Sequence, residues 1–179
     1  MINFKKVVLL FSVSLAFAQT TYVPDDNFEQ ALIDLGYDDI LDDYVLTENI
    51  SSVTSLDVRE KEISDLTGIE GFTALTDLKC KRNQLTTLNV SVNTALTYLD
   101  CHDNQLTALD LSANTALTDL DCSSNQLTSI NVSANTALNK LYCYSNQLTA
   151  LDVSANTALT YLDCHDNQLT SLDVSSNIA

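Results

Sequence analysis

Residues 93–113 read NTALTYLDCHDNQLTALDLSA, and the chain repeats this stretch with a period of 21 residues. Units of the same length begin at residues 72, 114, 135 and 156: FTALTDLKCKRNQLTTLNVSV, NTALTDLDCSSNQLTSINVSA, NTALNKLYCYSNQLTALDVSA and NTALTYLDCHDNQLTSLDVSS. One unit of this length cannot bury its own apolar face, so neighbouring units must stack and cover one another. The chain is therefore predicted to be a solenoid of five repeats over residues 72–176, preceded by a degenerate first coil over residues 51–71.

Each unit contains L-x-x-L-x-C-x-x-N-x-L, the leucine-rich-repeat pattern with cysteine in one apolar position. The L-x-C segment alternates, which predicts a short strand with Leu99 and Cys101 pointing inward and Tyr98, Asp100 and His102 pointing outward. We expect short parallel strands on the concave face. Repeats this short leave no room for a long convex helix, so turns or 3₁₀ helix are expected there. Apolar pairs of the returning halves should close the core: Leu88/Val90, Leu109/Leu111, Ile130/Val132, Leu151/Val153 and Leu172/Val174.

An asparagine recurs where each repeat is predicted to turn out of its strand. At this position a side-chain amide can bond backbone groups that the turn leaves unpaired. We therefore expect a structural ladder of five asparagines: Asn83, Asn104, Asn125, Asn146 and Asn167.

The five cysteines are spaced 21 residues apart, at positions 80, 101, 122, 143 and 164. Buried thiols behave as small hydrophobic groups, and burial raises their pKa. Neighbouring in-register strands give poor disulfide geometry, and zinc-type Cys-x-x-Cys spacing is absent. A reduced structural ladder is the favoured interpretation over one or more disulfides or a metal site.

Residues 19–50 lack the repeat and are predicted to form an N-terminal α-helical cap. Asp25 and Asp26 follow Pro24 and can cap a helix, which Gly36 would end. Phe28, Ala31, Leu32 and Leu35 would lie on one face of that helix and cover the first coil, as terminal coils require for solubility.

Eight acidic residues and no basic residue lie between Asp25 and Asp43. A calcium-binding loop is one interpretation. A solvated outer face of the cap, with acids placed favourably near the helix start, is the better one.

The first residues have the pattern of a cleaved secretory signal. Lys5 and Lys6 precede an apolar run from Val7 to Ala18, which is too short to span a bilayer. Cleavage after Ala18 would leave a secreted or cell-surface protein with no membrane insertion. The net charge of −16 becomes two units more negative when both lysines are lost, which argues against nucleic-acid binding.

The sequence LDCHDNQL occurs twice and resembles a catalytic or metal cluster, at Asp100–Asp103 and Asp163–Asp166. Cys101 is expected to point away from His102, and the two copies would stand about 14 Å apart at strand spacing, too far to share an ion. We expect ordinary concave-face residues here. No nucleophile elbow, phosphate loop or His-Glu-x-x-His motif is present, so no enzyme activity, metal or cofactor is predicted.

The outward strand residues would carry specificity. Cross-rung charge ladders are expected in two columns, Asp57–Lys79–Asp100 and Glu60–Arg82–Asp103. Exposed tyrosines offer large rigid contact area, although tyrosine is also simply a good strand former. The predicted ligand-binding residues are Tyr98, His102, Lys140, Tyr142, Tyr144, Tyr161 and His165.

The units with CxxNQLTxLDVSxNTALTxL resemble the repeats of internalin-J-type surface proteins, and similar chains occur among secreted proteins of the Bacteroidetes. The stretch from DNFEQALIDLGYDD to DLTGIEGF resembles an internalin-like cap and first coil. The resemblance implies a right-handed horseshoe, reduced stacked cysteines, surface display, and adhesion or protein recognition. It implies no catalytic residues.

Residues 177–179 begin a sixth, incomplete repeat. Without a polar cap, the last coil should expose apolar side chains and an unpaired strand edge. A fragment of a longer protein that continues beyond the chain, edge-to-edge self-association and a tolerated bare end are the alternatives, with the first preferred. The predicted function is recognition of a protein or glycan on the concave face. The alternative is a structural spacer in a larger exported protein that has a sorting or effector domain.

Overall fold

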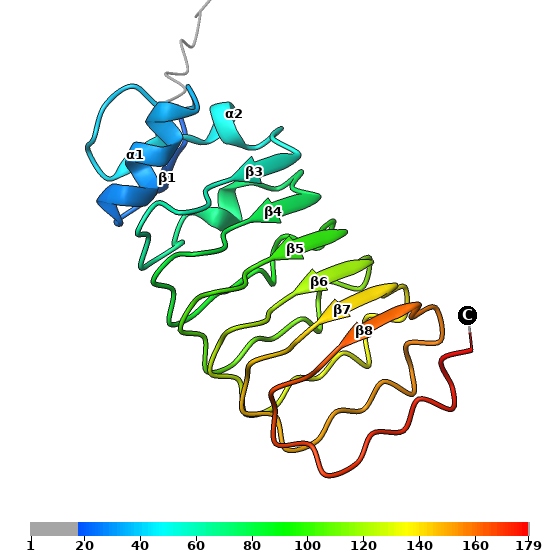
Figure 1. Ribbon diagram of the computed structural model, residues 1–179. Helices are drawn as coiled ribbons and strands as arrows, with labels where there is room; N and C mark the ends of the chain where they lie inside the picture. The colour runs from blue at the N-terminus through cyan, green and yellow to red at the C-terminus, as the bar shows by residue number, and fades with distance from the viewer. Residues whose placement is uncertain (1–17, 179) are drawn as a thin grey trace, which may run out of the picture.

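The computed structural model describes residues 18–178, and its main feature is one sheet of six parallel strands in chain order (Figure 1). Each strand is three residues long, and neighbouring strands from β3 to β8 pair in register. The strands are β3 (Ser55–Asp57), β4 (Asp77–Lys79), β5 (Tyr98–Asp100), β6 (Asp119–Asp121), β7 (Lys140–Tyr142) and β8 (Tyr161–Asp163). The predicted solenoid with short parallel strands is confirmed.

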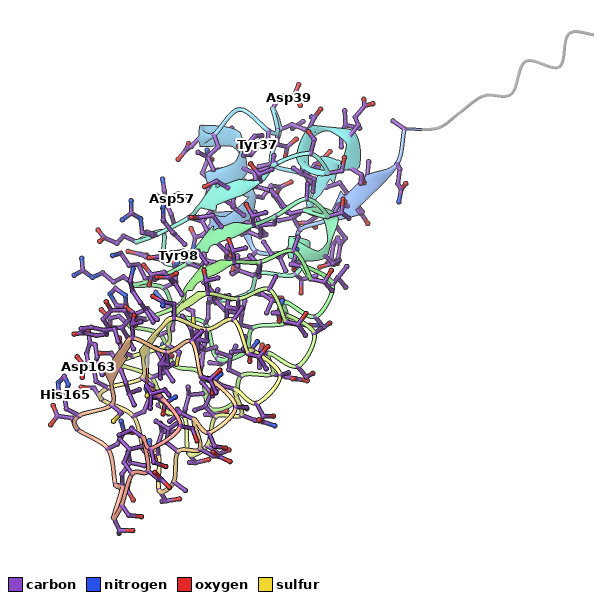
Figure 2. The ribbon with its side chains drawn as sticks, turned by 90° about the vertical axis from the view of Figure 1, so that its right-hand side faces the viewer. Tyr37, Asp39, Asp57, Tyr98, Asp163 and His165 are labelled. Atoms are coloured by element: carbon purple, nitrogen blue, oxygen red, sulfur yellow. The ribbon has the colours of Figure 1, made fainter. Side chains whose placement is uncertain are left out.

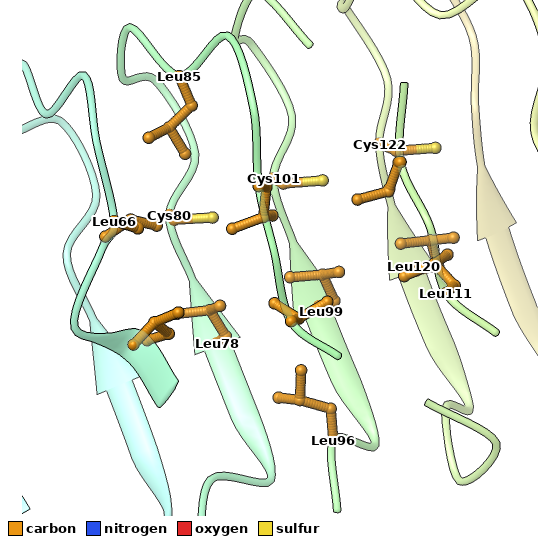
Figure 3. Close-up of a cluster of buried hydrophobic side chains, with 14 of the residues drawn as sticks. Leu66, Leu78, Cys80, Leu85, Leu96, Leu99, Cys101, Leu111, Leu120 and Cys122 are labelled. Carbon is orange, nitrogen blue, oxygen red and sulfur yellow. The ribbon is translucent and has the colours of Figure 1, made fainter. Parts of the chain in front are cut away.

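The core lies between the strands and the returning halves of the coils. Leu99 and Cys101 are fully buried, as the alternation predicts. Figure 3 shows Cys80, Cys101 and Cys122 in a row, one to each coil, with their sulfur atoms pointing the same way. Most of the predicted returning pairs are buried too. Three of their members differ: Ile130 is only partly buried, and Leu172 and Val174 of the last coil are exposed.

A left-handed residue follows each strand, three positions beyond its end. The φ angles are positive, between 50° and 58°, at Glu60, Arg82, Asp103, Ser124, Ser145 and Asp166. A side chain in this region costs about 1–2 kcal/mol, so the turn must be held by its surroundings. Backbone bonds between coils do this, such as the one from the Asp103 N–H to the Ser123 carbonyl (3.1 Å). Every coil thus leaves its strand by the same turn.

The predicted asparagine ladder lies directly after this turn. Asn104 donates through Nδ2 to the carbonyl oxygens of Cys80 and Cys101 (3.1 and 3.0 Å), and its Oδ1 accepts from the Leu85 N–H (3.0 Å). One amide therefore satisfies backbone groups of two neighbouring coils, which confirms its structural role.

A second asparagine ladder, which sequence reasoning missed, begins the four NTAL segments and recurs one period later at Asn177. Its members are Asn93, Asn114, Asn135, Asn156 and Asn177. Asn114 is fully buried, and its Nδ2 donates to the carbonyl oxygens of Val90 and Asn93 (3.0 and 2.9 Å). Buried backbone carbonyls need partners, so these asparagines hold the returning side of the stack as the first ladder holds the strand side. The repeated NT before each AL was the signal.

The N-terminal cap consists of β1 (Thr20–Tyr22), α1 (Asp26–Asp34), β2 (Tyr44–Leu46) and α2 (Thr47–Ile50), with β1 antiparallel to β2. A short 3₁₀ helix, η1 (Ile69–Gly71), follows in the first coil, and turns form the other returning segments. The apolar face of α1 buries Phe28, Ala31 and Leu32 as predicted. Leu35 was predicted to join them, but it ends the helix as its C-cap and is exposed.

Asp25 connects the cap to the first coil. Its Oδ1 accepts from the N–H groups of Asn27 and Phe28, and its Oδ2 accepts from the Ser64 N–H and hydroxyl and from the Asp65 N–H. Burial opposes ionisation of Asp25, but these hydrogen bonds outweigh it and hold the pKa of the carboxyl below its usual value. The predicted helix cap is thus also a tertiary contact.

Some acidic residues of the cap make structural contacts, although Glu29 Oε2 and Asp38 Oδ2 are buried without a hydrogen-bond partner. Glu29 is fully buried, and its Oε1 accepts from the N–H groups of Asp42 and Tyr44 (3.0 Å each). Asp34 pairs with Lys61 at 3.0 Å. Burial, together with repulsion from Glu29 and neighbouring acids, raises the pKa of Asp38. A calcium-binding loop here stays the less favoured interpretation.

Almost all of the predicted export signal, residues 1–18, lies outside the described residues. Within residues 18–178, no helix is long and apolar enough to cross a membrane. The domain boundaries assigned from the sequence remain predictions.

Candidate functional site on the strand face

The strand face is the outward surface of the sheet from β4 to β8. We define it as the first and third residues of each strand and the residue two positions beyond. Its members are Asp77, Lys79, Lys81, Tyr98, Asp100, His102, Asp119, Asp121, Ser123, Lys140, Tyr142, Tyr144, Tyr161, Asp163 and His165. Figure 2 shows Asp57, Tyr98, Asp163 and His165 along one side of the stack, from the capped end to the last coil.

Cations gather at the capped end of this face. Arg82 pairs with Glu60 at 2.7 Å and with Asp103 at 3.8 Å, so the ladder predicted for this column is present. The ladder predicted for Asp57–Lys79–Asp100 is wrong, although the three residues are in register. Lys79 pairs within its own strand with Asp77 (3.4 Å) and lies over the Tyr98 ring at 5.6 Å from its centroid.

The other members of that column also pair elsewhere. Asp57 forms a two-bond pair with Arg59, at 2.7 Å for each bond. Asp100 contacts Lys81 (Oδ2 to Nζ, 3.7 Å) and His102. These charged side chains therefore pair within their own strand or diagonally with a residue of the neighbouring coil. The strand register alone does not predict such pairs.

A cavity of about 340 Å³ opens at the centre of the strand face. Tyr98 from β5 and Tyr142 from β7 line it, with Lys81, His102 and Lys140. Carboxylates form much of the remaining lining: Asp100, Asp119 and Asp121, beside Leu120. Lys140 pairs with Asp119 at 3.0 Å. The cavity therefore combines aromatic walls with charged groups of both signs.

Tyr98 is the aromatic residue of this cavity with a clearly shifted pKa. Burial, reinforced by the nearby carboxylates of Asp100 and Asp121, raises the pKa of its phenol to about 12. A tyrosine hydroxyl is protonated at neutral pH even at its ordinary pKa, and the raised pKa extends this state to higher pH, so it can donate a hydrogen bond to a ligand.

The remaining aromatics form two contacts between the last two coils. The Tyr142 and Tyr161 rings lie 4.8 Å apart between centroids with a 34° tilt. Tyr144 and His165 stack at 4.8 Å with nearly parallel rings. These four residues form the aromatic surface of the last two coils, and Tyr142 also lines the cavity.

His102 joins two carboxylates from neighbouring strands. Its Nδ1 lies 2.8 Å from Asp100 Oδ1 and 3.4 Å from Asp121 Oδ2. The sequence correctly predicts that Cys101 is buried and points away from His102. It predicts an exposed Asp100, however, and this is wrong: only 6% of that side chain is exposed, because His102 and Lys81 lie against it. Asp100, His102 and Asp121 lie close enough together to hold a metal ion. Among the described residues, they are the single such group of His, Cys, Asp or Glu side chains.

The cysteines offer no reactive centre in the stacked coils. All five are free thiols, and the first four are buried. Burial raises the pKa of Cys101 and Cys122 well above the usual value and that of Cys143 to about 12. A thiol that stays protonated is a poor nucleophile. Cys164 differs from the expected buried ladder because it is partly exposed.

The structure brings four of the seven predicted ligand-binding residues to the cavity: Tyr98, His102, Lys140 and Tyr142. Tyr144, Tyr161 and His165 lie beyond it on the aromatic surface. Sequence reasoning missed Lys81, Asp119 and Asp121 as site residues. Their positions in the same alternating columns as the tyrosines were the available signal.

Comparisons with known proteins agree with this architecture. A family model for leucine-rich repeats in two copies matches residues 94–135. Internalin J of Listeria monocytogenes is 47% identical over 73 residues, which is 41% of this chain and 8% of that protein. The chain therefore spans a small part of this relative's length.

Solved structures extend the likeness to most of the chain. The functional domain of InlJ from Listeria monocytogenes, described as including a cysteine ladder, is 32% identical with a TM-score of 0.50 and covers 92% of this chain and 51% of its own. The internalin InlF of the same species is 26% identical with a TM-score of 0.79, covering 88% and 48%. A leucine-rich-repeat protein of Leptospira interrogans is 25% identical with a TM-score of 0.66, covering 70% and 34%.

Proposed function

We propose that this chain, a leucine-rich-repeat protein of the internalin-J-like type, is a non-enzymatic recognition module that binds a protein through its strand face. The observation that carries the proposal is the cavity between Tyr98 and Tyr142, together with the aromatic surface of the last two coils, which shares Tyr142 with it. Repeat scaffolds share a fold while their exposed residues set the partner, so the function must be argued from this surface.

Three properties of the surface favour a protein partner. Aromatic side chains are enriched in protein interfaces because they provide large contact area at low entropic cost. The ring pairs are already ordered by mutual packing, which reduces the entropy lost on binding. Lys81 and Lys140 lie beside the three cavity carboxylates, so the cavity can match a segment that carries both charges.

Export and adhesion belong to the same proposal. The N-terminal pattern of residues 1–18 and the resemblance to internalins support display outside the cell, where the strand face would meet partners on another cell or in the medium. A glycan is a second candidate ligand, since aromatic rings beside carboxylates also suit sugar faces and hydroxyls. A structural spacer is the alternative function, in which the strand face binds nothing.

The experiment compares two tyrosine pairs. The chain is immobilised, a partner is captured from the medium of the producing cells, and the affinity of the purified partner is then measured. Y142A/Y144A should weaken binding at least about tenfold, as expected for aromatic hot spots. Y22A/Y44A is the control, because this pair is exposed on the cap with ring centroids 5.4 Å apart.

Equal affinity of wild type and Y142A/Y144A would overturn the proposal. Loss of binding in both double variants would also overturn it, because the cap would then be part of the binding surface. An unfolding midpoint for each variant separates lost binding from lost structure.

A further inference from the structure

We infer that Asp100, His102 and Asp121 form a binding site for a divalent transition metal, with Zn²⁺ as the best match. Asp100 and His102 belong to coil β5, and Asp121 comes from the adjacent strand β6. The inference does not depend on the proposed recognition function. It rests on how these three side chains converge and on what holds them.

Three atoms with lone pairs face one another at this point. His102 Nδ1, one oxygen of Asp100 and one of Asp121 all lie within 4.8 Å of one another. Such a group needs a positive centre between its members, either a proton on Nδ1 or a metal ion. Tetrahedral zinc ligands at about 2.0–2.2 Å from the ion stand about 3.3–3.6 Å apart. The observed 3.4 Å from Nδ1 to Asp121 Oδ2 lies in this range. The 2.8 Å from Nδ1 to Asp100 Oδ1 is a hydrogen-bond distance, which must lengthen by roughly 0.5 Å when an ion replaces the proton on Nδ1.

The second oxygen of each carboxylate is held by another part of the protein. Asp121 Oδ1 accepts from the Ser123 N–H (3.0 Å) and hydroxyl (2.5 Å), which leaves Oδ2 toward His102. Asp100 Oδ2 faces Lys81 Nζ at 3.7 Å, which leaves Oδ1 toward His102. Partners of this kind orient metal ligands and strengthen binding in known metal sites. The site is thus oriented before any ion arrives.

The chemistry of the donors selects the ion. Two carboxylates and one imidazole suit Zn²⁺ and related transition metals, whereas Ca²⁺ and Mg²⁺ prefer oxygen ligands throughout. Three protein ligands would leave a fourth zinc position open. The site borders the cavity between Tyr98 and Tyr142, so that position can be reached by water or by a ligand atom.

The chain contains its own control for this site. Asp163 and His165 repeat the same local sequence in the last coil, and His165 Nδ1 lies 2.5 Å from Asp163 Oδ1. Within residues 18–178, no strand follows β8 to supply the counterpart of Asp121. If the metal needs all three ligands, His102 must matter and His165 must not.

The test is calorimetric titration of Zn²⁺ into the whole chain, with C164S as the common background to remove the partly exposed thiol. We expect one Zn²⁺ per chain and weaker or no binding of Ca²⁺. H102Q and D121N should each weaken Zn²⁺ binding at least about tenfold, and S123A, which keeps all three ligands, about tenfold through Asp121. H165Q should leave the affinity unchanged within about twofold.

The absence of a bound equivalent of Zn²⁺ in the C164S chain would overturn the inference, as would equal losses in H102Q and H165Q. Thermal unfolding gives a second measurement that does not rely on heats of binding. Zn²⁺ should raise the unfolding midpoint of the C164S chain but not that of its H102Q derivative, because only a bound ion stabilises the folded state. A rise of equal size in both would indicate adventitious binding and overturn the site.

Discussion

The fifteen residues from Asn93 to Thr107 recur unchanged from Asn156 to Thr170, yet the two copies differ in the exposure of their side chains. The side chains of Asp100 and His102 are 6% and 17% exposed, whereas those of Asp163 and His165 are 27% and 58% exposed. Coils cover the first copy on both sides, and in the described residues no strand lies beyond the second.

Local sequence therefore sets the backbone conformation of a repeat, while the neighbouring coil sets the burial and the contacts of its side chains. Both copies form the same strand, the same left-handed turn at Asp103 or Asp166, and the same asparagine bonds. The following coil buries the leucine and cysteine and adds Asp121 to the histidine. The same substitution made in each of the two copies can test these separate effects of local sequence and neighbouring coil.

The largest difference in the free energy of unfolding is expected when the core leucine of the strand is replaced. Leu99 is fully buried, whereas Leu162 is only partly buried. L99A should lower the free energy of unfolding by about 3–4 kcal/mol, and L162A by about 1 kcal/mol, because an exposed site leaves a smaller cavity. Urea unfolding followed by circular dichroism measures both. Equal losses would mean that the following coil contributes little to packing.

A smaller difference is expected for the asparagine ladder. Asn104 and Asn167 make equivalent hydrogen bonds, and Asn167 Oδ1 accepts from the Leu148 N–H at 2.9 Å. N104A leaves buried backbone groups without partners and should cost about 2–3 kcal/mol. N167A should cost under about 1 kcal/mol, because water reaches the half-exposed groups of the last coil. The same unfolding assay applies, and a larger loss for N167A would contradict the account.

The smallest effect concerns the outer histidine. Its hydrogen bond to Asp163, aided by the charge of Asp166, raises the pKa of His165 above the ordinary value of 6.5. The stabilising contribution is therefore complete below pH 6.5 and is lost as pH rises through the folded-state pKa. D163N should return the pKa of His165 toward 6.5, as measured by NMR titration of the ring protons in an H102Q background. An unchanged pKa would remove Asp163 as its cause.

Much of this structure could be predicted from sequence because the same 21-residue pattern occurs five times, and each copy forms the same coil. The period and the alternation of L-x-C place Leu99 and Cys101 inside and Tyr98 outside without any knowledge of side-chain contacts. The ladder role of Asn104 follows from its position after the strand. The helix at Asp26–Asp34 follows from Asp25 and the apolar spacing behind it.

The side-chain contacts that could not be predicted depend on the direction in which long side chains extend from the strand. Register aligns Lys79 with Asp57 and Asp100, but the lysine instead contacts Asp77 and the Tyr98 ring. His102 reaches diagonally to Asp121 on the next strand, which column alignment does not reveal. Leu35 fits the helical period yet lies at the C-cap, directly before the left-handed Gly36, and its side chain is exposed.

The effect of the neighbouring coil can be measured on the cysteines of the two copies. Cys101 is buried and Cys164 is partly exposed, although they lie in identical stretches of fifteen residues. The folded chain is treated with iodoacetamide at pH 8, and the modified cysteines are identified by mass spectrometry. If the following coil buries the thiol, Cys164 is modified in the folded chain, whereas Cys101 is protected until denaturant is added. Equal modification of both thiols in the folded chain would contradict this expectation.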